Sequence, residues 1–112
     1  MASTHDYEID SRNNNIQIYI DGEFFSRAEA KISVMDSGYL LGDGVWEGIR
    51  LYNNHLIHLE KHLERLYEGA EMIQMNIGIS KSEMRSALEQ TLQTNKMISD
   101  VHIRLIVSRG IK

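Results

Sequence analysis

Residues 45–54 read VWEGIRLYNN, and this stretch predicts a β-strand that ends in a tight turn. One side of the strand would carry Val45, Glu47, Ile49 and Leu51, and the other side Trp46, Gly48, Arg50 and Tyr52. Such a period of two residues is typical of a strand with one face toward a core. The pair Asn53-Asn54 favours a two-residue turn because asparagine tolerates the left-handed backbone conformation. Residues 55–58 are then expected to form the partner strand.

A second hairpin is predicted nearer the N-terminus. Residues 16–20 alternate with the same period, and Asp21-Gly22 follows at once. Asp-Gly between two apolar segments is a strong hairpin signal, because both turn residues must accept a positive φ. Residues 23–26 are the expected return strand. Residues 1–15 are polar and aperiodic, so we expect a polar N-terminal arm there and one small α+β domain over residues 16–112.

After residue 58 the period of the apolar residues changes to that of a helix, and two amphipathic helices are predicted. The apolar face of the first would consist of Leu59, Leu63, Leu66, Tyr67, Ala70 and Ile73. Ser80-Lys81-Ser82-Glu83 is a capping box, in which two side chains satisfy amides at the start of a helix. The apolar face of this second helix would consist of Met84, Ala87, Leu88, Thr91 and Leu92.

A closing strand is predicted near the C-terminus, where the period of two residues returns. Its apolar face would consist of Val101, Ile103, Leu105 and Val107, opposite His102, Arg104 and Ile106. Two hairpins, two helices and one strand, in this order, indicate the α+β class. We therefore expect an antiparallel sheet with two main helices packed on one face.

The composition excludes several classes of protein. A chain of 112 residues with 42% hydrophobic and 25% charged residues suits one globular domain. The formal net charge of −4 argues against nucleic acid as a partner, and no apolar run is long enough to span a membrane. Cysteine is absent, which excludes disulfides, thiolate metal sites and a cysteine nucleophile within this sequence. Its absence fits a reducing compartment, so we expect a cytoplasmic location.

The glycines within residues 42–48 do not match a phosphate-binding loop, because no Gly-Lys-Ser/Thr follows them. They favour a tight connection before the strand. Two arginines on polar strand faces, Arg50 beside Trp46 and Arg104 beside His102, suit two-pronged binding of a carboxylate. They are equally compatible with solvated or paired side chains.

Arg65 lies one helical turn after His62 and off the apolar face of its helix. From there it could reach an anion at the edge of the sheet. It could also pair with Glu68 across solvent, for little gain in stability. The local sequence leaves both interpretations open.

His55, His58 and His62 lie close enough in sequence to suggest a metal site. His55 belongs to a predicted strand and the other two flank a helix start, so hydrogen bonding at this junction is favoured and no metal site is predicted. None of the five lysines has the apolar or cationic surroundings that activate a lysine, and no serine stands on a nucleophile elbow. No catalytic residue is therefore predicted in this chain.

Four stretches occur together in the order and spacing of one enzyme family. They are Ala30 to Gly38, Gly42 to Arg50, His62 to Leu66 and His102 to Gly110. Over about residues 16–110 the chain resembles the class IV pyridoxal-phosphate aminotransferases. This family includes the branched-chain and D-amino-acid aminotransferases and aminodeoxychorismate lyase.

The resemblance implies roles for individual residues. The arginine of the His-x-x-Arg motif holds the phosphate of pyridoxal 5'-phosphate in the family, and this position is Arg65. The substrate pocket would be lined by Trp46, and Arg104 would receive the acidic side chain of glutamate or 2-oxoglutarate. Leu41 stands where branched-chain enzymes often have a pocket tyrosine, and Arg50 belongs to the branched-chain-like pattern.

The resemblance also implies that more protein is needed for activity. The family's chains are considerably longer, and the lysine that holds their cofactor lies in a second domain. We therefore expect the N-terminal domain of a branched-chain-like transaminase, inactive alone, whose complete form is a homodimer acting on amino acids and 2-oxo acids. Two alternatives stay open: an aminodeoxychorismate lyase-like enzyme, or a free-standing, non-catalytic module for binding or assembly.

Overall fold

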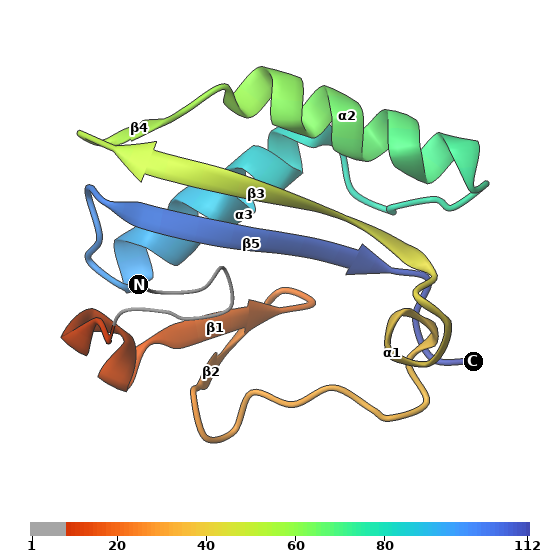
Figure 1. Ribbon diagram of the computed structural model, residues 1–112, viewed down its shortest axis with the longest axis horizontal. Coiled ribbons are helices and arrows are strands. Elements are labelled where there is room, and N and C mark those ends of the chain that lie inside the picture. The colour runs from red at the N-terminus through yellow and green to blue at the C-terminus, as the bar shows by residue number, and fades with distance from the viewer. Residues whose placement is uncertain (1–8) are drawn as a thin grey trace, which may run out of the picture. The chain divides into compact units, whose positions relative to one another are not determined.

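The computed structural model describes residues 9–112, which divide into two compact units with the boundary after Ala30. In the first unit a short 3₁₀ helix, Ser11–Asn15, precedes the hairpin of β1 (Gln17–Ile20) and β2 (Glu23–Ser26) (Figure 1). Residues 21 and 22 both have positive φ, as an Asp-Gly turn requires. The predicted N-terminal hairpin is confirmed, and residues 1–8 of the predicted arm lie outside the described residues.

The second unit contains six elements in the order α1 (Ser37–Leu41), β3 (Gly44–Tyr52), β4 (His55–Leu56), α2 (Leu59–Met72), α3 (Lys81–Thr94) and β5 (Val101–Ser108). Its sheet is antiparallel with the strand order β4-β3-β5 (Figure 1). Strand β5 pairs with β3 over almost its whole length, from Gly44 opposite Ser108 to Leu51 opposite Val101. The predicted closing strand is thereby confirmed, and the structure places it next to the strand at residues 45–52.

Both long helices pack on one face of this sheet. Ile49 of β3 is fully buried and forms one core cluster with residues of both helices: Leu59, Leu63, Leu66, Met84 and Leu88. The alternation along β3 is therefore the one that the sequence predicts, and the α+β class with two helices on an antiparallel sheet is confirmed. Among residues 9–112 no helix combines the length and apolar composition needed to cross a bilayer.

The capping box at the start of α3 is also present. The Ser80 hydroxyl accepts a hydrogen bond from the Glu83 amide at 3.1 Å, and the Glu83 carboxylate accepts one from the Ser80 amide at 3.0 Å. Each side chain thus satisfies a backbone amide that the helix leaves without a partner. This interaction fixes the first turn of α3, from which Met84 reaches the core.

Two expectations differ from the structure. The partner strand of β3 covers only His55–Leu56 instead of residues 55–58, because His58 adopts a left-handed φ of 55° that ends the strand and starts α2. Before β3 only Gly42 and Asp43 form the predicted tight connection, and the residues ahead of them, for which no element is predicted, form the five-residue helix α1. Its N-cap is Asp36, whose side chain accepts from the Gly38 amide. A helix of barely more than one turn has too few residues for an apolar period to appear.

Candidate functional site

Trp46 and Glu47 are consecutive residues of β3, so their side chains project to opposite faces of the sheet. Trp46 lies on the face away from the helices and is 59% exposed. Glu47 lies on the helix-covered face and is 5% exposed. Each of the two side chains contacts one arginine from another element, and these two pairs make up the candidate site.

The first pair consists of Trp46 and Arg104. The guanidinium carbon of Arg104 lies 4.6 Å from the centre of the Trp46 ring, within cation–π distance. The register of β3 and β5 explains this contact, since Trp46 is opposite Ile106 and Arg104 is opposite Gly48. Residues of one face that are diagonal across two strands lie within reach of long side chains. The structure thus brings together two of the predicted substrate-binding residues.

Gly48 makes room for a neighbour of this pair. A Cβ atom at Gly48 would lie 2.7 Å from Cε1 and 2.8 Å from Nε2 of His102. The imidazole ring therefore occupies the space that a side chain at residue 48 would fill. As a result His102 and Arg104 both lie over the middle of β3, on the face of Trp46.

Arg50 lies on the same sheet face as Trp46, as the strand period predicts. Its guanidinium carbon lies 5.6 Å from the ring centre of Tyr52. The arginine that contacts the Trp46 ring is Arg104 of β5. Arg50 thus remains on the same sheet face, nearer the turn.

The second pair consists of Glu47 and Arg65. Arg65 of α2 donates from Nε to both carboxylate oxygens, at 3.1 and 3.0 Å, and from Nη2 to Oε1 at 2.7 Å. His62, one turn earlier, has its Nδ1 2.7 Å from the same Oε1. Arg65 is therefore paired within the chain, with Glu47 and not with Glu68. The hydrogen-bonding interpretation of the three histidines is confirmed for His62.

The charges in this network stabilise each other. The hydrogen bonds from Arg65 lower the pKa of Glu47 below its ordinary value, burial acts in the opposite direction, and His62 lowers the pKa further. The pKa of Arg65 is raised, chiefly by its hydrogen bond to Glu47. Because an ionised carboxylate only accepts hydrogen bonds, the His62 Nδ1 at this contact must carry a hydrogen.

Arg65 combines a buried anchor with an exposed head group. Its side chain is 72% exposed, whereas Glu47 is 5% exposed. Among the described residues no partner is found for its Nη1, so this nitrogen is available to an external acceptor. A guanidinium group fixed along one edge suits an anion with several oxygens, such as a phosphate.

The remaining predicted residues lie outside these two pairs. Leu41 is the last residue of α1 and is 63% exposed. All five lysines are exposed, and within residues 9–112 no group of three His, Cys, Asp or Glu side chains is arranged to hold a metal ion. A groove between β4, α2 and α3 contains none of the predicted site residues, and its arginine, Arg85, is paired with Glu60.

The sequence predicts no role for Glu47 or for the space above Gly48, and it predicts hydrogen bonding by His62 without naming the partner. A signal for Glu47 was present, because it is the one charged residue on an otherwise apolar strand face. A buried carboxylate needs a cationic or hydrogen-bonding partner. Helix α2 covers this strand face, and Arg65 belongs to α2.

A comparison with known protein families agrees with this arrangement. Residues 44–112 match the family model described as amino-transferase class IV. The matched region spans more than half of the chain and includes both pairs of the candidate site, Trp46 with Arg104 and Glu47 with Arg65. The chain therefore belongs to the class IV aminotransferases.

Individual relatives point to the same family. The chain is 42% identical over 96 residues to a Methanocaldococcus jannaschii protein that is named as a branched-chain-amino-acid aminotransferase. The match covers 86% of this chain and 33% of that protein. It is 35% identical over 95 residues to D-alanine aminotransferase from Staphylococcus haemolyticus, a match of 85% of this chain and 33% of that protein. The chain spans about a third of the length of these two relatives.

A solved structure shares the fold. The branched-chain aminotransferase from Thermoproteus uzoniensis, determined with norvaline, superimposes with a TM-score of 0.73 at 31% sequence identity. The superposition covers 80% of this chain and 32% of that one. The similarity thus concerns one part of the larger enzyme.

Proposed function

We propose that this chain is the N-terminal domain of a pyridoxal-phosphate-dependent transaminase. The complete protein would move an amino group between a branched-chain-like amino acid and a 2-oxo acid such as 2-oxoglutarate. One observation carries the proposal: consecutive residues of β3, Trp46 and Glu47, each hold one arginine in place. One arginine then serves the cofactor phosphate and the other a substrate carboxylate.

Arg65 fits the phosphate group of the cofactor. Its Nε and Nη2 are occupied by Glu47, and Nη1 points a donor away from the buried carboxylate. The charge of Glu47 fixes the guanidinium plane without blocking its exposed edge. When bound, pyridoxal 5'-phosphate supplies the electron sink for chemistry at the α-carbon of the amino acid. The part of this chain is to hold and orient the phosphate end. The structure of a related branched-chain aminotransferase with pyridoxamine 5'-phosphate supports the choice of cofactor.

Trp46 and Arg104 fit the substrate side. The indole ring provides an apolar surface for a branched side chain, and the guanidinium group provides a partner for the second carboxylate of a dicarboxylic 2-oxo acid. The cation–π contact limits the rotamers of Arg104. Leu41 and Arg50 are proposed as further pocket residues, and the norvaline in the related enzyme supports an amino acid substrate.

The reaction needs more protein than this chain provides. None of its five lysines is buried, whereas a lysine that forms a covalent bond with the cofactor needs surroundings that lower its pKa. We place that lysine in the part of the protein that corresponds to the remaining length of the relatives. The chain by itself is then expected to be inactive.

The test is an assay of the complete protein with leucine, isoleucine, valine and D-alanine as amino donors and 2-oxoglutarate as acceptor. Formation of glutamate with the branched-chain donors supports the proposal. Glutamate formation only from D-alanine would contradict the branched-chain assignment, and release of pyruvate from aminodeoxychorismate without glutamate formation would indicate a lyase. Activity of residues 1–112 alone would contradict the placement of the lysine.

We further propose that the complete protein is a cytoplasmic homodimer. The absence of cysteine supports a reducing compartment. The exposed Tyr39, Leu40 and Leu41 of α1 support burial of this surface in a larger assembly. Light scattering of the complete protein tests the dimer, and cell fractionation tests the location.

A further inference from the structure

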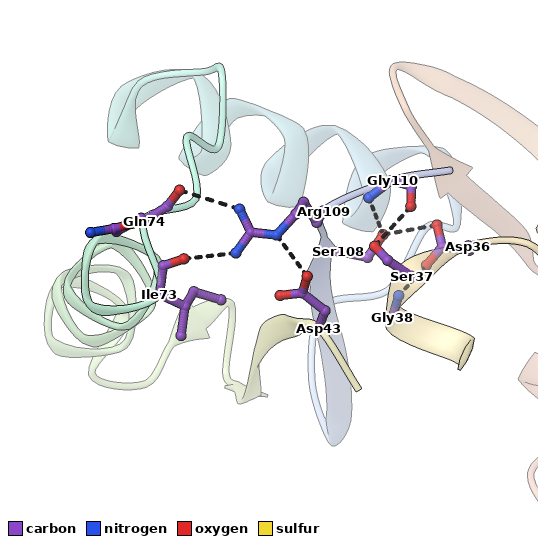
Figure 2. Close-up of polar contacts among 9 residues, drawn as sticks. All are labelled: Asp36, Ser37, Gly38, Asp43, Ile73, Gln74, Ser108, Arg109 and Gly110. Carbon is purple, nitrogen blue, oxygen red and sulfur yellow. Dashed lines mark hydrogen bonds and ion pairs between the residues drawn. The ribbon is translucent and has the colours of Figure 1, made fainter. Parts of the chain in front are cut away.

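Two groups of polar contacts converge on Ser108-Arg109-Gly110, the tripeptide that ends β5 and follows it (Figure 2). One group connects the tripeptide to Asp43, the residue just before β3. The other connects it to the start of α1. These two points of attachment enclose residues 36–43, the segment that contains α1 and Leu41. We call the tripeptide and its partners the clamp.

Arg109 uses its whole guanidinium group in the clamp. Nε donates to Asp43 Oδ2 at 2.6 Å, Nη2 to the carbonyl of Ile73 at 2.7 Å and Nη1 to the carbonyl of Gln74 at 3.2 Å (Figure 2). Its backbone amide also donates to the carbonyl of Asp43, at 3.1 Å. Ile73 and Gln74 follow the last residue of α2, where backbone carbonyls lack partners within the helix. Arg109 therefore joins the end of α2 to the start of β3.

Ser108 and Gly110 hold the other end of the segment. The Ser108 hydroxyl donates to Asp36 Oδ2 at 2.9 Å, while Asp36 Oδ1 accepts from the amide of Gly38 at 2.8 Å. The carbonyl of Gly110 accepts from the amide and the hydroxyl of Ser37, both at 2.8 Å. A Cβ atom at Gly38 would lie 2.8 Å from Cβ of Ser108, so only glycine permits this approach.

Helix α1 depends on these contacts for its position. A helix of five residues is too short to be stable by itself. Ser37 is its only buried residue, and the three apolar side chains Tyr39, Leu40 and Leu41 are exposed. Within this chain apolar packing therefore contributes little to the position of α1, and the polar contacts at both ends hold the segment.

We propose that Arg109 is a positioning residue for the substrate pocket, which acts through Asp43 to fix residues 36–43 and thereby Leu41 and Trp46. The inference rests on the proposed function, in which these two residues line the pocket. Asp43 precedes Trp46 by three residues, and Leu41 precedes Asp43 by two. Arg109 itself touches neither substrate nor cofactor in this role.

The experiment uses the complete protein with three substitutions. Arg109→Met removes all side-chain hydrogen bonds, and Arg109→Lys keeps a charge for Asp43 without the planar fork. Arg85→Met is the matched control, because Arg85 and Arg109 have the same side-chain exposure of 41% and each forms one ion pair. For every variant we would measure KM and kcat for the amino donor, equilibrium affinity for pyridoxal 5'-phosphate, and amide hydrogen exchange over residues 36–46.

Arg109→Met is expected to raise KM about tenfold, because a small displacement of pocket residues weakens substrate binding. Its kcat and cofactor affinity should stay within a factor of about two of the wild type. Exchange over residues 36–46 should become faster. The KM and the exchange rate of Arg109→Lys should lie between those of Arg109→Met and the wild type. Arg85→Met should match the wild type in both quantities. If Arg109→Met does not fold, Ser108→Ala removes only the hydroxyl that bonds Asp36 and the Gly110 amide, and a smaller rise in KM and a smaller increase in exchange are then expected.

Two results would overturn the proposal. One is equal KM and equal exchange in Arg109→Met and Arg85→Met. The other is a loss of kcat and cofactor affinity as large as the rise in KM, which indicates general destabilisation. If the wild-type protein transfers no amino group, the proposed function fails. The exchange data then test separately whether Arg109 fixes residues 36–43. Faster exchange over residues 36–46 in Arg109→Met than in Arg85→Met would then support it, and equal exchange would overturn it.

Discussion

Glu47 and Arg65 are joined by three hydrogen bonds of 2.7 to 3.1 Å, although one side chain is buried and the other exposed. The carboxylate belongs to the core-facing side of β3, and the guanidinium reaches it from the surface of α2. A rigid strand thus determines the orientation of a surface arginine. This pre-ordering lowers the entropy that Arg65 loses when it binds an anion.

Replacement of Arg65 should weaken the binding of the cofactor phosphate. Arg65→Ala in the complete protein is expected to weaken the affinity for pyridoxal 5'-phosphate by about 10–100-fold, because a charged hydrogen-bonding group is lost. Arg65→Lys should recover only part of it, since an ammonium group cannot bind Glu47 along one edge and offer a second edge to the phosphate. Equilibrium titration followed by cofactor absorbance measures the affinity. Inorganic phosphate as a competitor identifies the phosphate end as the part affected, and an unchanged affinity in both variants would refute the assignment.

Glu47 should make the stability of the domain depend on pH in the acid range. Its pKa is lower in the folded state than in an unfolded chain, so its contribution is fully present above the ordinary carboxyl pKa. The contribution is lost as the pH falls through the lowered value. Glu47→Gln is expected to reduce the free energy of unfolding at pH of about 7 by about 1–3 kcal/mol. The difference from the wild type should shrink below a pH of about 4.

Denaturant unfolding of the complete protein at a series of pH values tests this prediction. Glu68→Gln is the control, because Glu68 is an exposed glutamate on the same helix as Arg65. The control should follow the wild type at every pH. A Glu47→Gln variant whose stability deficit stays constant into acid would contradict the role of the ionised carboxylate.

The fold could be predicted where side-chain period reports burial. The alternation along residues 45–52 indicated both faces of β3, because the helices cover only one side of the sheet. Helix α1 escaped prediction, since polar contacts to Ser108, Arg109 and Gly110 hold its segment and such contacts have no period. The shortened β4 follows from the left-handed backbone of His58, a residue whose type does not announce that conformation.

The sequence could predict which residues belong to the candidate site, but not which of them contact each other. Trp46, Arg104 and Arg65 were identified by residue type and motif. The contact of Arg104 with Trp46 depends on the strand register, and that of Arg65 with Glu47 depends on how α2 lies over β3. Register and helix orientation result from the packing of the whole core, so a local sequence pattern does not specify them.

A side chain at Gly48 should displace the His102 ring. Gly48→Ala would place a Cβ within 2.8 Å of the His102 ring and force the imidazole away from β3. The expected loss of stability is about 1 kcal/mol or less, because the exposed His102 ring need only change its rotamer. Gly69→Ala is the control, because its added Cβ would meet only Val45, at 3.4 Å, within a helix that favours alanine. Thermal unfolding of both variants in the complete protein tests the prediction, and equal effects would show that His102 yields without cost.

Arg104 should discriminate between dicarboxylic and monocarboxylic 2-oxo acids. Arg104→Ala in the complete protein is expected to raise KM for 2-oxoglutarate by about 10–100-fold, the equivalent of one charge-assisted hydrogen-bonded contact, and to affect pyruvate much less. Trp46→Leu should raise KM for 2-oxoglutarate by a smaller factor, because it removes the ring that limits the rotamers of Arg104. Steady-state kinetics with both acceptors measures the ratio, and Arg85→Ala serves as the control for loss of a surface arginine. An equal rise in KM for the two acceptors would show that Arg104 supports the pocket generally, whereas a rise confined to 2-oxoglutarate assigns it to the second carboxylate.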